Sequence, residues 1–248
     1  MIALLWAGTV AVAASVSIQT ADGVSLRATT EQTAASKRAA VLVHMEGRSS
    51  ADWASLADRL SKSGISSIAP DLRGHGDSGG ERTHTEMVQD VRAATDWLAA
   101  QGAEEIVCIG AEIGANLCLM AADDDPRISA AALLSPRLNP SGLNAPRAMQ
   151  GWTSGSVLAV ASTDDSSGSK CVDLLARIAG EDRAEVVVLS DAGVGTQMLS
   201  RAPSLEGRLI EWLSASSTLS GADLVGSRPD TTDSTTVEAE GEMLRTHQ

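Results

Sequence analysis

The chain contains no phenylalanine and no tyrosine, so its five tryptophans are the only large aromatic side chains among 248 residues. This scarcity removes the aromatic surfaces on which the bases of single-stranded nucleic acids stack. Positive charge is also scarce, because 19 lysines and arginines are set against 32 aspartates and glutamates, which gives a formal net charge of −13. A protein of this charge repels a phosphate backbone, and we therefore expect no nucleic-acid partner.

Cysteine is the next scarce residue. Cys108, Cys118 and Cys171 form an odd number without CxxC spacing, a pattern that supports neither a disulfide framework nor a zinc site. Cys108 lies in an apolar strand-like run and Cys118 in an apolar helix-like run. Buried thiols in such runs pack as small hydrophobic groups, and we predict that role for both.

Long hydrophobic runs are absent apart from one segment near the start. Residues 2–16 are almost wholly apolar or small, and residues 11–13 resemble a signal cleavage site, but no lysine or arginine occurs before Arg27. The pattern leaves two interpretations open, a secretory signal over residues 1–15 or a buried strand. We expect an exported protein, periplasmic or secreted, in the first case and a cytoplasmic one in the second. The segment is too short for a stable membrane span.

The other end of the chain is dominated by serine, threonine, glycine and acidic residues, from 215 to 248. It has no apolar periodicity that would bury a face against a core. We therefore predict a disordered acidic tail over residues 215–248. The remaining residues, 16–214, are enough for a single domain with a filled core.

Short apolar runs alternate with amphipathic stretches throughout this domain. The runs predicted as strands are 16–20, 24–30, 39–43, 65–69, 105–110, 130–134, 156–161 and 185–189. The first two flank Asp22-Gly23, which is typical of a hairpin turn. A helix is predicted over about 85–100, with an apolar stripe of Met87, Val91, Ala94 and Leu98. The alternation predicts an α/β fold: a mostly parallel, doubly wound sheet with an N-terminal antiparallel hairpin and helices on both faces.

Functional groups gather at the carboxyl ends of the strands in such a sheet, and one of these loops has a distinctive pattern. The segment Gly110-Ala111-Glu112-Ile113-Gly114 lies between an apolar strand and an apolar helix-like run. It resembles the G-x-S-x-G nucleophile elbow of the α/β hydrolases, in particular small serine esterases and dienelactone-hydrolase-like proteins. The resemblance implies a hydrolase fold over roughly residues 16–214, with an oxyanion hole at Met45 and Ile113.

Two of the three catalytic positions depart from the family pattern. The resemblance places Glu112 at the nucleophile position, Asp164 at the acid position and Val194 at the base position. A triad depends on a histidine that accepts the proton of the serine hydroxyl, and valine cannot do this. The resemblance with these departures implies a catalytically inactive pseudoenzyme, an esterase-like fold that can still bind a small-molecule ligand.

His44 and Glu46 are the other candidate pocket residues. The resemblance places their loop beside the oxyanion hole, where Glu46 would oppose the charge of a tetrahedral intermediate. We expect His44 to orient this loop by hydrogen bonding. The loop that contains His75, between Arg73 and Asp77, looks like a structural signature of the family, and Arg73 and Asp77 are expected to hold it together. The remaining histidines are His84, at a predicted helix start, and His247, in the predicted tail.

Two alternatives stay open at this point. Glu112 acting with Asp164 or His44 would make an active hydrolase of esters or related small substrates. Glu46, Glu112 and Asp164, with His44, would instead form an acidic pocket for a divalent cation or an amine. No ligand-spacing motif supports a metal, so we expect no metal and no cofactor. Nothing in the sequence specifies an oligomeric state.

Overall fold

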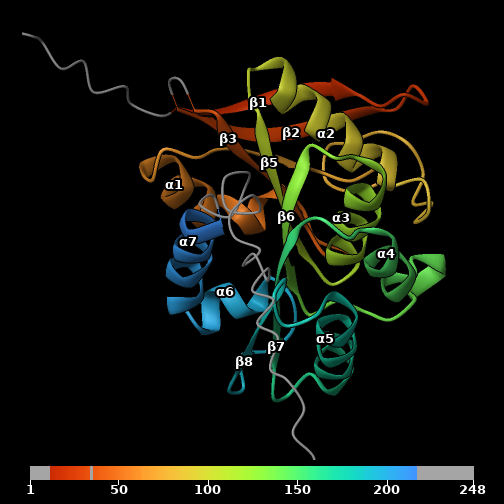
Figure 1. Ribbon diagram of the computed structural model, residues 1–248. Helices are drawn as coiled ribbons and strands as arrows, with labels where there is room; N and C mark the ends of the chain where they lie inside the picture. The colour runs from red at the N-terminus through yellow and green to blue at the C-terminus, as the bar shows by residue number, and fades with distance from the viewer. Residues whose placement is uncertain (1–11, 34–35, 217–248) are drawn as a thin grey trace, which may run out of the picture.

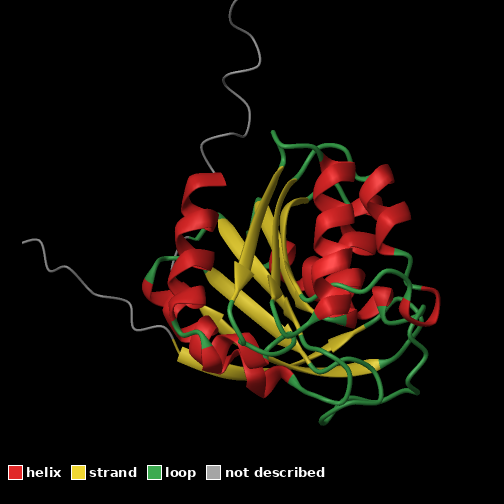
Figure 2. Cartoon of the chain, turned by 90° about the horizontal axis from the view of Figure 1, so that it is seen from below, coloured by secondary structure: helices red, strands yellow, loops and turns green. Residues whose placement is uncertain are grey.

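The computed structural model describes residues 12–33 and 36–216, which form one sheet of eight strands with helices on both faces (Figure 1; Figure 2). In chain order the elements are β1 Val12–Gln19, β2 Ser25–Gln32, β3 Arg38–Val43, the 3-10 turn η1 Ser50–Trp53, α1 Ala54–Lys62, β4 Ser66–Pro70, α2 Val88–Ala100, β5 Glu105–Ala111, α3 Ile113–Asp124, β6 Ile128–Leu134, η2 Pro140–Gly142, α4 Ala145–Gly151, β7 Ser156–Ser162, α5 Ser166–Ala179, β8 Ala184–Leu189, α6 Gln197–Arg201 and α7 Ser204–Ser216.

The strands cross the sheet in the order β1-β2-β4-β3-β5-β6-β7-β8. The pairs β1–β2 and β2–β4 are antiparallel and each remaining pair is parallel. Every strand predicted from the sequence is present, so the predicted α/β fold with an N-terminal hairpin is confirmed. β1 begins at Val12 rather than Val16, because it pairs with β2 as far as Gln32. The rest of the predicted signal segment and the predicted tail beyond Ser216 lie outside the described residues.

Two apolar layers hold the helices onto the sheet. The helices α2, α3, α4 and α5 bury their apolar side chains on one face, and α1, α6 and α7 bury theirs on the other (Figure 1). The predicted stripe of α2 lies in the first layer, where Met87, Val91, Ala94 and Leu98 are at most 1% exposed. Among the described residues, no helix has the length and apolar character needed to cross a membrane.

The turn from β5 into α3 depends on close approaches at two glycines. A Cβ atom on Gly110 would lie 2.3 Å from the carbonyl oxygen of Gly114, and a Cβ on Gly114 would lie 2.3 Å from the carbonyl oxygen of Val43. Both obstructing atoms belong to the backbone and cannot rotate away. Glycine therefore allows β3, β5 and the start of α3 to pack at this distance.

A disulfide between Cys108 in β5 and Cys118 in α3 spans the same turn, with a Cα–Cα distance of 5.4 Å. The prediction that both residues are unpaired thiols is therefore wrong. Helix α3 folds back over β5, which brings residues ten positions apart in the sequence within the range of a disulfide. Cys171 in α5 is a free, buried cysteine, and burial raises the pKa of its thiol to about 12.

The glycine packing predicts a strong effect of a single methyl group. Gly110→Ala or Gly114→Ala should lower the free energy of unfolding by more than about 2 kcal/mol, because the added carbon overlaps rigid backbone. Gly207→Ala in α7 is the matched control, since its Cβ would meet Arg59 at an ordinary 3.5 Å, and alanine is favoured in a helix interior by about 0.5–1 kcal/mol. Urea unfolding measures all three, and elbow variants as stable as the control would contradict the packing.

The disulfide predicts a defined thiol count. Titration of the unfolded, unreduced protein should detect one thiol, that of Cys171, and the reduced protein should show three, because the other two sulfurs are released only by reduction. The Cys171→Ser variant is the control and should show none before reduction. Three reactive thiols in the unreduced protein would rule out the Cys108–Cys118 bond.

Candidate functional site

Glu112 lies at the sharp turn between β5 and α3, at the carboxyl edge of the sheet. Its backbone has φ 52° and ψ −113°, in a region that residues with side chains seldom occupy. The Glu112 amide donates to the Leu134 carbonyl at 2.8 Å, which fixes the turn to the end of β6. Such a conformation costs of order 1–3 kcal/mol and persists where the surrounding structure enforces it. The turn raises the Glu112 side chain above the sheet and leaves it 23% exposed.

The carboxylate of Glu112 faces a guanidinium that sequence reasoning missed. Arg137, just beyond the end of β6, places Nε 3.5 Å from Glu112 Oε1 and donates from Nη1 to Asp165 Oδ1 at 2.8 Å. Burial alone would raise the pKa of Asp165, but the hydrogen bonds from Arg137 and the Gly168 amide outweigh it and hold that pKa below its usual value. Arg137 therefore joins the elbow to the loop after β7. Its position directly after a predicted strand was the available signal.

Asp164 lies beside the loop that contains Val194. Its carboxylate accepts hydrogen bonds from the Ser162 hydroxyl and from the Gly193 amide, the latter at 3.0 Å. These two bonds, that of Ser162 first, lower the pKa of Asp164. Arg201 Nη1 is 3.9 Å from the other oxygen. The hydrogen bond from the Gly193 amide thus holds the loop that contains Val194 beside Asp164.

The Val194 loop also reaches the elbow and the loop after β3. The Gly195 amide donates to Ser135 Oγ at 3.0 Å. A Cβ atom built on Gly195 would lie 2.9 Å from Met45 Sδ and 3.4 Å from the Cβ of Ala111. Met45, predicted to border the oxyanion hole, therefore lies where the Val194 loop meets the end of β5, and Ile113, the other predicted residue, begins α3 two positions after Ala111. The loops after β3, β5, β7 and β8 converge at one edge of the sheet, as the doubly wound topology requires.

His44 does not face this convergence. Its side chain is fully buried, its Nδ1 donates to the Met45 carbonyl at 2.8 Å, and its Nε2 accepts from the Leu72 amide at 2.9 Å. Both ring nitrogens are therefore used by the backbone. Burial lowers the pKa of His44 and favours the neutral ring. These contacts fit the predicted orienting function and leave no free nitrogen for a proton transfer.

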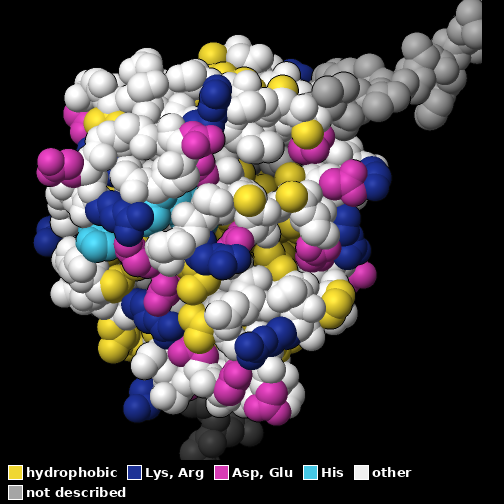
Figure 3. All heavy atoms as spheres, turned by 180° about the vertical axis from the view of Figure 1, so that it is seen from behind, with side chains coloured by type: hydrophobic (Ala, Val, Ile, Leu, Met, Phe, Trp, Pro, Cys, Tyr) yellow, Lys and Arg dark blue, Asp and Glu magenta, His cyan; other side chains and the backbone are white. Residues whose placement is uncertain are grey.

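Glu46 turns away from Glu112 and Asp164, contrary to the expected acidic cluster. Its Oε2 accepts from His84 Nε2 at 2.7 Å, and its Oε1 lies 3.3 Å from His75 Nε2. Burial would raise the pKa of Glu46, but these histidines reverse the effect and lower it. Histidine atoms reach the surface among basic and acidic side chains on the face in Figure 3. No group of three or more His, Cys, Asp or Glu residues within the described ranges could hold a metal ion.

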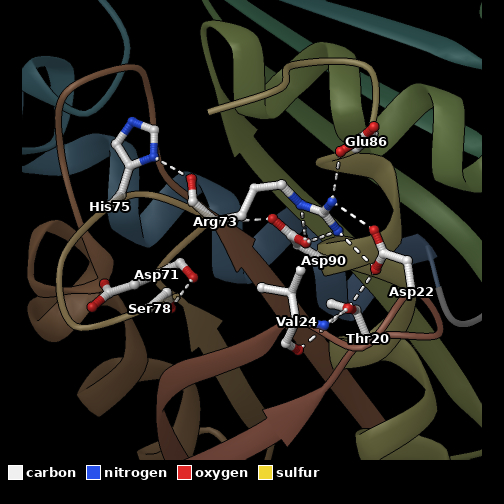
Figure 4. Close-up of polar contacts among 9 residues, drawn as sticks. All are labelled: Thr20, Asp22, Val24, Asp71, Arg73, His75, Ser78, Glu86 and Asp90. Carbon is white, nitrogen blue, oxygen red and sulfur yellow. Dashed lines mark hydrogen bonds and ion pairs between the residues drawn. The ribbon is translucent and has the colours of Figure 1, made fainter. Parts of the chain in front are cut away.

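An ion cluster around the buried Arg73 fixes the loop that carries His75 (Figure 4). Arg73 is 1% exposed and binds Asp90 on α2, Asp22 in the β1–β2 turn, and Glu86. Hydrogen bonds from Arg73 lower the pKa of Asp22 to about 2. The Arg73 carbonyl accepts from His75 Nδ1 at 3.1 Å. The cluster gives Arg73 the structural role predicted for it.

Asp77 contributes to the same loop through its backbone. Its amide donates to Asp71 Oδ2 at 3.1 Å, while Asp71 Oδ1 accepts from the Ser50 amide at 2.7 Å. The exposed Asp77 carboxylate is not the partner of Arg73, although the sequence placed the two on either side of the same turn. Asp71 therefore joins this loop to the segment after β3, next to the predicted site.

A cavity of about 440 Å³ opens beside the converging loops. Met45, Asp52, Thr196 and Leu199 are among the residues that line it. Thr196 Oγ1 donates to Asp52 Oδ2 at 2.6 Å, and the side chains of Met45 and Leu199 add apolar surface to the walls. Its volume lies within the range of small-molecule sites, which combine apolar walls with a few polar groups.

Solved structures similar to this chain include an esterase and two hydrolases. An esterase of Pyrococcus furiosus is 18% identical with a TM-score of 0.68, over 83% of this chain and 91% of that one. A predicted CIB-like hydrolase of Thermoplasma acidophilum is 18% identical with a TM-score of 0.69, over 83% and 100%. An α/β hydrolase of a Penicillium species is 17% identical with a TM-score of 0.72, over 83% and 99%. At these identities the likeness concerns the fold alone.

Sequence comparison gives the family. No curated protein matches the chain significantly. The family model of the serine aminopeptidases S33 matches residues 34–191, well over half of the chain. This match spans β3 to β8 and includes the elbow and the acid position. The α/β-hydrolase resemblance is therefore confirmed, and the chain belongs to the serine aminopeptidase S33 family.

Proposed function

We propose that this protein is a catalytically inactive member of its family that binds a small molecule beside the former catalytic site. The observation that carries the proposal is the pairing of Glu112 with Arg137 at the elbow, opposite a loop that offers Val194 in place of a base. Serine hydrolases need a hydroxyl nucleophile and an imidazole that takes its proton. The side chains at these positions supply neither group.

A carboxylate at the elbow does not by itself restore turnover. Glu112 could attack an electrophile, but the resulting covalent ester must then be hydrolysed by an activated water. The Val194 side chain has no lone pair that could accept a proton from water, and both ring nitrogens of His44 are hydrogen-bonded to the backbone. Arg137 further holds the carboxylate in an ion pair. A chain with these groups would react once and stop.

The cavity beside the site supports the binding part of the proposal. It lies against Met45 and Thr196, on two of the loops that converge near the elbow. Its hydrogen-bonded Thr196–Asp52 pair provides a polar anchor next to the apolar Leu199. The cation-pocket alternative has less support, because Glu46, Glu112 and Asp164 each face a different partner.

The turnover of a short-chain activated ester tests the proposal. The purified protein and its Glu112→Ala variant should both hydrolyse p-nitrophenyl acetate at the same rate, close to the buffer background, because neither has a nucleophile and base pair. A multiple-turnover rate that disappears only in Glu112→Ala would contradict the proposal and would favour a hydrolase that uses the glutamate.

Restoring the missing groups provides the positive arm of the same experiment. Glu112→Ser combined with Val194→His should raise the rate about 100-fold or more above either single variant, since a positioned base contributes about 10²–10⁴-fold. Adding Asp164→Asn should abolish most of that gain, because the acid would no longer orient the imidazole. A folded double variant without any gain would contradict the assignment of Glu112 and Val194 to the catalytic positions.

A further inference from the structure

The buried ring of His75 has one nitrogen with two contacts that need different protonation states. The Gly47 amide donates to His75 Nε2 at 3.3 Å, and Glu46 Oε1 lies 3.3 Å from the same nitrogen. The first contact needs the lone pair of Nε2. The second needs a proton on Nε2, because an ionised carboxylate can only accept hydrogen bonds. Glu46 and Gly47 are neighbours in the loop after β3, so the protonation state of His75 decides which of them it binds.

The other ring nitrogen of His75 determines which tautomer the neutral ring adopts. Nδ1 lies 3.1 Å from the Arg73 carbonyl oxygen, which can only accept, so Nδ1 carries a proton (Figure 4). A neutral ring has one N–H group, so its Nε2 is unprotonated and accepts from Gly47. An imidazolium has N–H groups at both positions, so its Nε2 donates to Glu46 and can no longer accept from Gly47. The gain of one proton therefore exchanges one partner for the other.

Glu46 keeps the negative charge that attracts an imidazolium. Burial would raise the pKa of Glu46, but the hydrogen bond from His84 and the charges of both histidines lower it. The carboxylate is therefore ionised over about pH 5–8, the range in which histidine ordinarily gains a proton. Arg82 Nη1, 3.8 Å from Glu46 Oε1, adds a positive charge beside the same group.

The other charged side chains near His75 are engaged with partners of their own. These pairs are Arg48 with Asp52, Asp71 with two backbone amides, and Arg73 with its ion cluster. Burial lowers the pKa of His44, whose ring centroid lies 5.0 Å from that of His75, so this neighbour stays neutral. Of the residues that the structure describes, Glu46 is thus the one anion in contact with the His75 ring.

A cavity of about 410 Å³ gives the buried ring access to protons from solvent. Gly47, His75, Gly76 and Arg82 are among the residues that line it. The side chain of His75 is 1% exposed. The cavity therefore provides a path for a proton to a ring that the protein encloses elsewhere.

Glu46 and Gly47 are the central residues of a turn that borders the ligand cavity. The Arg48 amide donates to the Met45 carbonyl at 3.2 Å across this turn. Met45 and Arg48, the outer residues of the turn, line the cavity of about 440 Å³ beside the converging loops. An exchange of partners at the centre of the turn therefore acts on two residues of the cavity wall.

We propose that His75 is a pH-sensitive switch of this turn, which binds the Gly47 amide when neutral and the Glu46 carboxylate when protonated, and that the exchange alters the wall of the ligand cavity. The Gly47 contact forms above the pH at which His75 gains its proton, and the Glu46 ion pair forms below it. The effect on the cavity rests on the proposed function, because it matters only if a ligand binds there. The exchange itself involves no ligand and no turnover.

Nuclear magnetic resonance of the full chain between about pH 8 and about pH 5, the range in which histidine ordinarily titrates, tests the exchange. At the upper limit the ring nitrogens of His75 should show a proton on Nδ1 and none on Nε2. On acidification Nε2 should gain a proton, and the Gly47 amide signal should shift with the same midpoint, because this amide loses its acceptor. The Met45 methyl signal should shift with that midpoint as well, since Met45 lies on the same turn.

Two variants assign the response to the contact between His75 and Glu46. Glu46→Gln removes the anion and should lower the midpoint of the His75 signals by roughly one pH unit, the lower end of the effect that an adjacent opposite charge has on an ionisable group. His84→Gln, which removes the other histidine bound to Glu46, is the matched control. In this variant the His75 and Gly47 signals should still change together.

The exchange and its effect on the cavity can fail separately. A proton on His75 Nε2 at the upper pH limit, a Gly47 signal that stays constant while His75 titrates, or an unchanged midpoint in Glu46→Gln would overturn the exchange. A constant Met45 signal would overturn the effect on the cavity wall. Multiple turnover of p-nitrophenyl acetate would contradict the proposed function alone, because none of these signals depends on a ligand or on turnover.

Discussion

The rest of this structure depends on one constraint, the close packing of backbone against backbone at Gly110 and Gly114, where a side chain would not fit. It allows β5 to turn into α3 against the carbonyls of Val43 and His44, which brings the end of β3 against the start of α3. The unusual backbone conformation of Glu112 follows from it, because the turn is fixed at both sides. The turn between β5 and α3 therefore holds the side chain of residue 112 above the sheet, whichever amino acid stands at that position.

The packing of the backbone at the site is thus independent of the side chains that the site carries. The elbow, the contact of Asp164 with the Gly193 amide and the approach of Gly195 to Met45 all bring the loops into register. In the proposed assignment, the positions that would move a proton are occupied by Glu112 and Val194. Arg137 provides the Glu112 carboxylate at the elbow with a counter-charge, which a hydroxyl group at the same position would not need.

Most of the fold could be predicted from the sequence, because the apolar runs were well separated and the elbow glycines stand at diagnostic spacing. The pairing of Cys108 with Cys118 could not, because it depends on how α3 folds back over β5 and not on the number of cysteines. The orientation of Glu46 was missed for a similar reason. The position of Glu46 in the sequence predicts which loop it lies on. It does not predict the direction of its side chain, which depends on a hydrogen bond with His84 from a distant part of the chain. Arg137 was overlooked because no familiar motif surrounds it.

The disulfide across the elbow has a consequence for the denatured chain. A covalent link that closes a loop of about ten residues removes conformations from the unfolded ensemble, an entropic effect of roughly 3 kcal/mol in favour of the folded state. If the disulfide is reduced, the two thiols pack as small apolar groups and the folded state loses this entropic stabilisation. The resistance of the Glu112 turn to local opening is therefore set in part by the redox potential of the surroundings, and the same sequence would have a stiffer elbow in an oxidising compartment than in a reducing one.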